Sequence, residues 1–209
     1  MCKYNLLNGY VGNKASYTNK IQALFDPTCT KYFEPFAGGA SIYFSHYNGK
    51  YQKEGLNDRN PNIALLYMSL ADEETREATI HAILSIEKPD DKNVAKEQFR
   101  RKMLKPYCRA SDVPKEKRVE LCRDIFIVYS QSFNCAGKSY SKQKSNAKYK
   151  IEVKRNLMNA VDRLKEHPTI YNADGIEMIK KVKNQSETQL FVDWPYVGLY
   201  RSSSKLYQT

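Results

Sequence analysis

The chain has 209 residues, 41% hydrophobic and 27% charged, which is the composition of a globular protein with a real core. This length allows one domain, or one domain carrying a sizeable insertion. The five cysteines are odd in number and form no Cys-x-x-Cys, so a secreted disulfide framework is excluded and a reducing cytoplasm is expected. The scattered histidines suggest no metal site, and the longest apolar stretch, 63–71, is too short to span a bilayer.

The net charge of +11 is unusual, and its location is more informative than its size. Between Lys88 and Arg155 there are 19 Lys and Arg residues against 8 Asp and Glu, whereas the rest of the chain holds 15 of each sign. The whole surplus therefore lies in one central segment, which favours a nucleic-acid-binding module set into a neutral scaffold. A solvated basic face and a membrane-surface patch are the alternatives.

The first stretch of interest is a glycine-punctuated loop, 8–14, in which Tyr10 and Lys14 stand four residues apart. A ring and an ammonium at this spacing suit a small anionic or aromatic ligand, although a plain turn would have the same pattern. Residues 31–36 then read as a strand, followed by a small-residue turn, 37–41, and an apolar run from Ile42 that predicts the start of a helix.

The turn at 37–41 is typical of backbone that approaches a cofactor closely. It matches neither Gly-x-Gly-x-x-Gly nor a phosphate-binding P-loop, which disfavours a dinucleotide or a triphosphate. Twenty residues after Gly38, Asp58 is predicted to end the second strand, where an acid can accept hydrogen bonds from both hydroxyls of a ribose. The alternative is that Asp58 caps the helix predicted from Ile63.

The basic segment is predicted to be mainly helical. Val119, Cys122, Phe126 and Tyr129 are spaced as one apolar stripe, and Leu157, Val161 and Leu164 as another, and both stripes are expected in the core. Between them, residues 130–144 mix small, amide, aromatic and lysine side chains without periodicity. This mixture suits a loop that reads a DNA groove, and a plain mobile loop is the alternative.

Near the end of the chain, 169–174 resembles a short strand ending in an acid, and a helix is expected from Ile176 to Lys183. The apolar run 190–192 predicts a final strand, which Pro195 stops. Asp193, the Trp194 carbonyl and the Tyr196 ring would then meet a planar ring bearing an amino group, unless the strand simply ends in a turn. Alternation of strand and helix at both ends of the chain predicts an α/β fold with a mainly parallel sheet flanked by helices.

Together, these stretches resemble the Dam-type DNA adenine methyltransferases, which use S-adenosylmethionine. The likeness runs from about Asn8 to Tyr200 and rests on four motifs in the family's order. They are Tyr-Val-Gly-Asn-Lys (10–14), Phe-Glu-Pro-Phe-Ala-Gly-Gly-Ala (33–40), Leu-Asn-Asp-Arg-Asn-Pro (56–61) and Asp-Trp-Pro-Tyr (193–196). Each motif alone is weak, but four in order around a basic insert make a specific match.

The resemblance implies a Rossmann-like methyltransferase fold in which 1–70 and 166–209 bind the cofactor and 71–165 is the target-recognition insert. It assigns the cofactor pocket to Tyr10, Lys14, Phe36, Gly38, Gly39, Asp58, Asp174 and Asp193. It assigns catalysis to Asp193, Trp194, Pro195 and Tyr196. The residues expected to contact DNA are Asn134, Gly137, Lys138, Tyr140, Lys142 and Lys144.

The implied reaction moves a methyl group from S-adenosylmethionine to the exocyclic amine of a flipped adenine in duplex DNA, leaving S-adenosylhomocysteine and needing no metal. The sequence departs from the family at Trp194, where Pro is usual, at Ala40, where Gly is usual, and at Gly175, where Phe is usual. Only 13 residues follow Tyr196, so the C-terminal strands that complete the family's sheet are expected to be missing.

Two further readings remain open: a relic that binds DNA, with or without cofactor, but transfers nothing, and an enzyme that acts on RNA. The expected partners are double-stranded DNA and a restriction endonuclease that cuts the same site, with no membrane. The expected location is the cytoplasm of a bacterium, or of a phage-infected cell.

Overall fold

The computed structural model describes residues 6–7, 10, 12–45, 49–87, 92–102, 109–141, 147–182 and 184–194. Its sheet has four parallel strands in the order β3-β2-β1-β4. The strands are β1 (Lys31–Glu34), β2 (Lys53–Asn57), β3 (Thr169–Tyr171) and β4 (Thr188–Leu190). The parallel sheet flanked by helices confirms the α/β, Rossmann-like fold predicted from the sequence.

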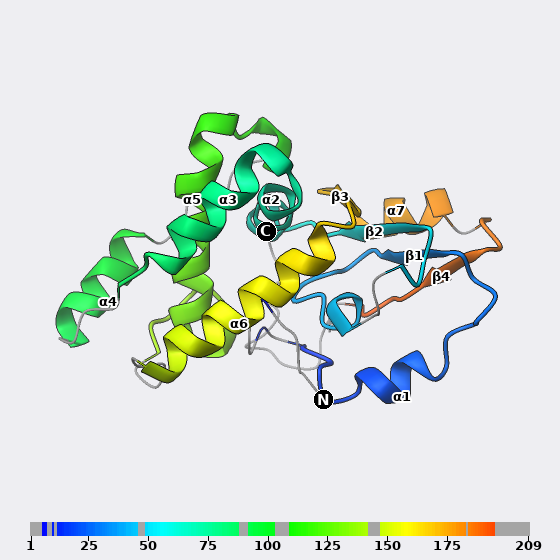
Figure 1. Ribbon diagram of the computed structural model, residues 1–209, viewed down its shortest axis with the longest axis horizontal. Helices are drawn as coiled ribbons and strands as arrows, with labels where there is room; N and C mark the ends of the chain where they lie inside the picture. The colour runs from blue at the N-terminus through cyan, green and yellow to red at the C-terminus, as the bar shows by residue number, and fades with distance from the viewer. Residues whose placement is uncertain are drawn as a thin grey trace.

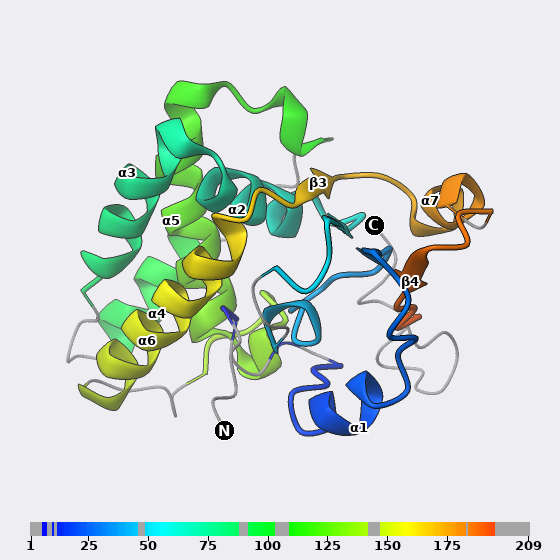
Figure 2. The same cartoon turned by 45° about the vertical axis from the view of Figure 1, so that its right-hand side comes forward.

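The helices gather largely on one side of the molecule, next to β3, while the sheet occupies the other side with α1 and α7 (Figure 1). Figure 2 shows the same division after a 45° turn. The α-helices are α1 (Thr18–Gln22), α2 (Pro61–Ala71), α3 (Glu73–Leu84), α4 (Lys92–Arg101), α5 (Lys115–Gln131), α6 (Ala147–Leu164) and α7 (Gly175–Val182). The short 3-10 turns are η1 (Tyr43–Ser45), η2 (Ala110–Asp112) and η3 (Phe133–Cys135).

The apolar stripes predicted in the basic segment form the core, as expected. Phe126 of α5 and Leu157 of α6 are essentially inaccessible, and they belong to one cluster with Tyr32 and Leu56 of the sheet. Because an amphipathic helix is stabilised mainly by burying its apolar face, α5 and α6 are held by packing against α2 and the sheet. The helical segment is therefore attached directly to the edge of the sheet.

The apolar run from Ile42 does not begin the α-helix expected there. Among the described residues it makes only η1, and Ile42, Tyr43 and Phe44 are all buried in succession. An amphipathic helix buries one face and leaves the other exposed, so three consecutive buried residues do not fit that pattern. The Tyr43 backbone N–H instead donates to the Glu34 carboxylate (2.8 Å), which ties the turn back to β1.

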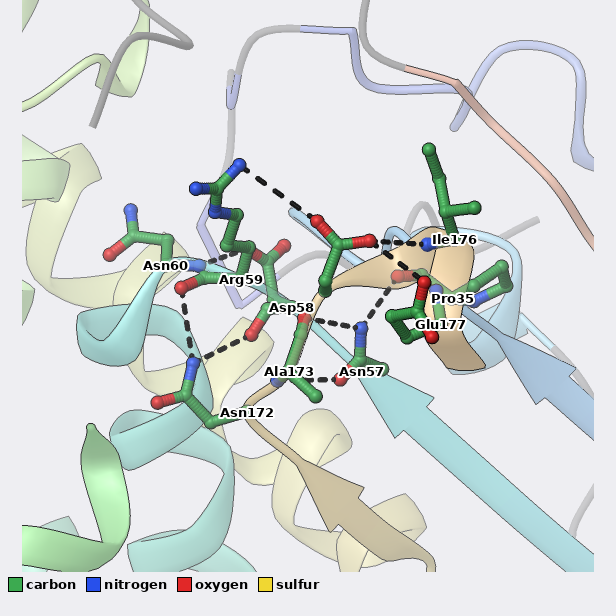
Figure 3. Close-up of polar contacts among 10 residues, drawn as sticks. Pro35, Asn57, Asp58, Arg59, Asn60, Asn172, Ala173, Ile176 and Glu177 are labelled. Carbon is green, nitrogen blue, oxygen red and sulfur yellow. Dashed lines mark hydrogen bonds and ion pairs between the residues drawn. The ribbon is translucent and has the colours of Figure 1, made fainter. Parts of the chain in front are cut away.

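One buried amide fastens the carboxyl ends of three strands. Asn57, the last residue of β2, is fully buried, and its Nδ2 donates to the carbonyls of Pro35 (2.8 Å) and Ala173 (3.1 Å). Its Oδ1 accepts from Ala173 N–H (3.0 Å) (Figure 3). A primary amide offers two donors and an acceptor, so this single side chain satisfies both neighbouring loops. The loops after β1, β2 and β3 are thereby held in one arrangement.

A second asparagine adds to this connection. Asn172 Nδ2 donates to the carbonyls of Asp58 (2.8 Å) and Arg59 (3.1 Å), as Figure 3 shows. Its Oδ1 accepts from Ala110 N–H (2.8 Å) in η2. The loop after β3 is thus bonded both to the loop after β2 and to η2, which lies between α4 and α5 in the sequence.

We expect Asn57→Ala to destabilise the protein by about 2–4 kcal/mol, because it leaves buried backbone groups of Pro35 and Ala173 without partners. Chemical denaturation measures this loss, and the melting temperature should fall by roughly 5–15 °C. The matched control is Asn184→Ala at an exposed turn position, where the change should stay within about 0.5 kcal/mol. Equal stabilities for the two variants would contradict the role given to Asn57.

Candidate active site

The candidate site lies where the four strands end. The turn after β1, the loop 58–60 after β2, the loop 172–174 after β3 and the segment 191–194 after β4 all follow carboxyl ends of parallel strands. Parallel strands place these ends at one edge of the sheet, the edge where open α/β sheets bind ligands.

The glycine turn after β1 is shaped by two close contacts. Gly38 has a left-handed backbone (φ 48°), its N–H donates to Asp58 Oδ2 (2.7 Å) and its carbonyl accepts from the Tyr67 hydroxyl (2.6 Å). A Cβ at Gly38 would lie 3.0 Å from Tyr10 Cε1, and one at Gly39 would lie 3.2 Å from Tyr10 Cβ. Both glycines are therefore needed for the Tyr10 ring to lie against this turn.

Ala40 also has a left-handed backbone (φ 46°). It stands where the family that the sequence resembles usually has glycine. The left-handed conformation costs an alanine about 1–2 kcal/mol, whereas glycine adopts it freely. The side chain of Ala40 is buried.

Asp58 sits between the turn and the start of α2. Besides Gly38, its carboxylate accepts from Asn60 N–H through Oδ1 (2.8 Å). The capping alternative for Asp58 is wrong, because Asn60 is the N-cap residue of α2 and accepts from Asn62 N–H (3.1 Å). Burial raises the pKa of Asp58, and the two backbone donors oppose this shift.

Asp174 lies at the first turn of α7. Its Oδ1 accepts from the backbone N–H of Ile176 (2.9 Å) and Glu177 (3.3 Å), an N-capping arrangement. Its Oδ2 is 3.9 Å from Arg59 NH1, and both side chains are largely exposed, so this ion pair contributes little. Asp174 therefore positions α7, a role that the sequence did not indicate.

An aromatic pair fills the space beside α7. A Cβ on Gly175 would lie only 2.3 Å from Phe36 Cε1, so the Phe36 ring rests directly on the glycine backbone. The Phe36 ring centroid is 5.2 Å from that of Trp194, whose side chain is 47% exposed. Two of the departures from the family pattern, Gly175 and Trp194, thus both contact the Phe36 ring.

Asp193 forms an ion pair with Lys14 across the edge of the sheet. Lys14 Nζ is 2.5 Å from Asp193 Oδ2 and also donates to the Gly12 carbonyl (2.6 Å). Lys14 N–H donates to Ser41 Oγ (3.1 Å), which fixes the loop against the glycine turn. Both partners of the ion pair are about a quarter exposed or less, so they are reachable from solvent.

The final strand ends earlier than predicted. β4 stops at Leu190 rather than Val192, although Phe191 N–H still bonds to the Phe33 carbonyl (3.0 Å). Asp193 is consequently three residues beyond the strand, in an extended segment. Pro195 and Tyr196 lie outside the described residues.

Glu34, at the end of β1, is a buried acid that the sequence analysis did not select. Its Oε1 accepts from the Tyr32 hydroxyl (2.5 Å) and from Tyr43 N–H (2.8 Å). Burial raises its pKa to about 8, helped by the negative charges of Asp193 and Glu54. Glu34 is therefore largely protonated at neutral pH. Its signal in the sequence was an acid inside the buried run of a strand.

The predicted DNA-reading loop contains an ordered hairpin, 131–141. Ser132 and Tyr140 form an antiparallel bridge, Phe133 N–H bonds to the Ser139 carbonyl (2.8 Å), and Ser141 N–H bonds to the Gln131 carbonyl (2.8 Å). Within the hairpin, Gly137 has φ 71°. The described part of the loop thus has a hydrogen-bonded backbone, and its role in reading DNA stays a prediction.

Of the residues expected to contact DNA, Gly137 and Lys138 lie in the hairpin, and the Tyr140 ring packs 5.9 Å from Phe99 of α4. Lys142, Lys144 and the side chain of Asn134 lie outside the described residues. The hairpin also presents Phe133, which directly precedes Asn134 and is 61% exposed.

Residues 10–209 match the family model of the D12 class N6 adenine-specific DNA methyltransferases. The chain belongs to this family, and the resemblance inferred from its four motifs is confirmed. Membership indicates an adenine-specific DNA methyltransferase with DNA as its substrate, and methyltransferases in general use S-adenosylmethionine. No curated protein matches the chain.

Within the described residues, no cluster of three or more His, Cys, Asp or Glu side chains is arranged to hold a metal ion. None of the described helices combines the length and the hydrophobicity that crossing a membrane would require.

We expect Gly175→Ala to cost about 1–3 kcal/mol, because the new methyl group would displace the Phe36 ring. Denaturant unfolding measures the loss. In a Phe36→Ala background the same substitution should instead be neutral or slightly stabilising, since alanine suits a helix better than glycine. A similar loss in both backgrounds would show that Phe36 is not the obstacle.

Proposed function

We propose that this protein transfers the methyl group of S-adenosylmethionine to the exocyclic amine of an adenine flipped out of duplex DNA. In this proposal, 1–70 and 166–209 form the catalytic part and 71–165 the target-recognition part. The proposal deepens the family assignment by giving individual residues their roles. Its main support is the Lys14–Asp193 ion pair (2.5 Å), which brings two of the motifs to the edge that carries the glycine turn.

The residues at the strand ends fit the proposed cofactor. Each Asp58 oxygen accepts one described hydrogen bond, and a carboxylate oxygen has a second acceptor position, which suits a ribose hydroxyl. The left-handed turn at Gly38 and Gly39 keeps backbone close to the Tyr10 ring, with no Cβ in between. Tyr10, Phe36, Gly38, Gly39 and Asp58 would therefore hold the nucleoside and the methionine chain.

The ion pair gives Lys14 and Asp193 distinct roles. Lys14 orients the Asp193 carboxylate by holding Oδ2, and in the described part of the chain no hydrogen bond reaches Oδ1. Asp193 Oδ1 would accept one hydrogen of the adenine amine, and the Trp194 backbone carbonyl would accept the other. When bound, the cofactor supplies an electrophilic methyl group on its sulfonium.

Adenine's exocyclic amine is a poor nucleophile, because its lone pair is delocalised into the ring. Two acceptors that draw its hydrogens would favour a pyramidal nitrogen and leave the lone pair directed at the methyl group. The nitrogen would release one proton once it carries the methyl group. Positioning of this kind supplies most of the proposed catalysis. Tyr196, by its place in the motif, would stack on the flipped base and offset roughly 1–3 kcal/mol of the cost of flipping.

On the DNA side, the hairpin 131–141 would enter a groove. Lys138, with Lys142 and Lys144, would neutralise phosphates, while Asn134 would bond to base edges and the backbone at Gly137 would approach the duplex. The exposed Phe133 ring adds an apolar surface for base contact. The recognition sequence, once determined, would identify the restriction endonuclease that the proposal expects as a partner.

We expect Asp193→Ala to lower methyl transfer at least about a hundredfold, because the amine would lose an acceptor that positions it. The assay measures labelled methyl groups incorporated into unmethylated duplex DNA from S-adenosylmethionine, with the label assigned to N6-methyladenine after digestion. Lys14→Met should reduce transfer less, since the acceptor remains but loses its orienting partner.

The same assay separates the other readings. If the parent protein, without substitutions, binds DNA with steep salt dependence but incorporates no label, it is the inactive relic. Label that appears in structured RNA in preference to duplex DNA would move the substrate to RNA. Undiminished transfer by the Asp193→Ala variant would remove this carboxylate from the mechanism.

We expect Trp194→Pro to raise kcat by up to roughly tenfold, because proline fixes φ and so sets the direction of the accepting carbonyl. Cofactor affinity should fall at the same time, since Phe36 loses the neighbouring indole. Single-turnover assays and calorimetric titration measure the two effects. Trp194→Phe is the matched control, which keeps a ring beside Phe36 without fixing φ. A kcat for Trp194→Pro no higher than that of this control would rule out the idea.

A further inference from the structure

The carboxyl end of α5 lies between the proposed cofactor site and the proposed DNA-reading hairpin. Tyr129, two residues before the end of this helix, is buried, and its hydroxyl accepts from Asn60 Nδ2 (2.7 Å). Its ring centroid is 6.0 Å from that of Tyr10. Burial raises the pKa of the Tyr129 phenol, so this hydroxyl stays neutral throughout the physiological range.

On the cofactor side, Tyr129 is one step away from the proposed ribose acceptor. Asn60 bonds to Tyr129 through its side chain and to Asp58 Oδ1 through its backbone N–H (2.8 Å). The other oxygen of Asp58 accepts from Gly38 N–H (2.7 Å). A ribose hydroxyl of the cofactor would therefore bind the same Asp58 carboxylate that accepts hydrogen bonds from Asn60 and from the glycine turn.

On the DNA side, Tyr129 supports the hairpin by backbone and ring. Ser132 Oγ donates to the Tyr129 carbonyl (3.0 Å) and accepts from Gly137 N–H (2.8 Å). A Cβ on Gly137 would be in van der Waals contact with Tyr129 Cε1 at 3.5 Å, so the ring packs beneath this glycine. Tyr129 thus contacts the hairpin through both its backbone carbonyl and its ring.

We infer that Tyr129, linked through Asn60, is a positioning residue that couples occupancy of the cofactor site to the conformation of the hairpin that reads DNA. The inference rests on the proposed function and extends it to communication between the two sites. Hydrogen bonds link each residue to the next from Gly38 through Asp58, Asn60 and Tyr129 to Ser132 and Gly137, and the links pass between side chain and backbone within Asn60 and within Tyr129. Such a chain changes affinity at one end only if its arrangement differs with ligand at the other.

If the ordered hairpin binds DNA more tightly, a ligand that orders it through Tyr129 must, by reciprocity, bind more tightly when DNA is present. The effect requires no movement of domains, because a small change in the Asp58 carboxylate is passed on by short hydrogen bonds that are at least partly buried. Cutting the Asn60–Tyr129 bond should separate the two sites energetically while leaving each in place.

Two substitutions cut this bond from opposite sides. Tyr129→Phe removes the hydroxyl but keeps the ring beneath Gly137. Asn60→Ser keeps a good helix cap for α2 but is too short to reach Tyr129. Tyr43→Phe is the matched control, since it removes another buried tyrosine hydroxyl. That hydroxyl bonds to the Arg163 carbonyl (3.1 Å) and is not part of the series of hydrogen bonds from Gly38 to Gly137.

The experiment measures backbone hydrogen exchange in 131–141 with and without saturating S-adenosylhomocysteine, whose binding is first established by calorimetry for every variant. In the parent and in Tyr43→Phe, the product should slow exchange of the hairpin at least about fivefold. In Tyr129→Phe and Asn60→Ser the change should be no more than about twofold, although the product still binds. The hairpin of the double variant Tyr129→Phe/Asn60→Ser should respond to the product as strongly as that of either single variant, because both substitutions remove the same bond.

The inference is overturned if the hairpin of Tyr129→Phe responds as the parent does, or if the parent binds the product without any change in hairpin exchange. Failure of the parent to bind S-adenosylhomocysteine at all would instead reject the proposed cofactor site, and the inference with it. A second readout is the affinity for S-adenosylhomocysteine with and without an unmethylated mixed-sequence duplex. DNA should raise this affinity severalfold in the parent but not in Tyr129→Phe or Asn60→Ser.

Discussion

The arrangement of this protein depends on one buried amide. Asn57 bonds to the backbone of the loops after β1 and β3 from its own position at the end of β2. Buried polar groups are costly unless paired, so these bonds allow a single arrangement of three loops rather than several of similar energy. The glycine turn, Asp58 and the start of α7 all follow from that arrangement.

The same edge of the sheet carries two acids in different environments. Glu34 lies in the core and is largely protonated at neutral pH, because burial outweighs its two hydrogen-bond donors. Asp193 stands at the surface of the edge, about a quarter exposed and paired with the Lys14 ammonium. Two ionised carboxylates in this region would repel each other, so neutral Glu34 removes one source of repulsion from Asp193.

Local pattern was a good guide wherever burial follows a regular repeat. The stripe from Val119 to Tyr129 predicted α5, and the sheet was predicted from the alternation of strand and helix. Local pattern was a poor guide at the ends of helices and strands and in turns, where specific hydrogen bonds decide the backbone conformation. The run from Ile42 makes only a 3-10 turn, β4 stops before Val192, and α2 is capped by Asn60 rather than Asp58.

The sequence by itself determined the class of the fold, the family through its four motifs, and the concentration of positive charge in the central segment. Only the tertiary structure decided which of these residues meet. Lys14 and Asp193 are 179 positions apart, and Asn60 and Tyr129 are 69 apart. Apolar periodicity encodes which face of an element is buried, whereas such contacts depend on strand order and on how α5 packs against α2, which no local pattern contains.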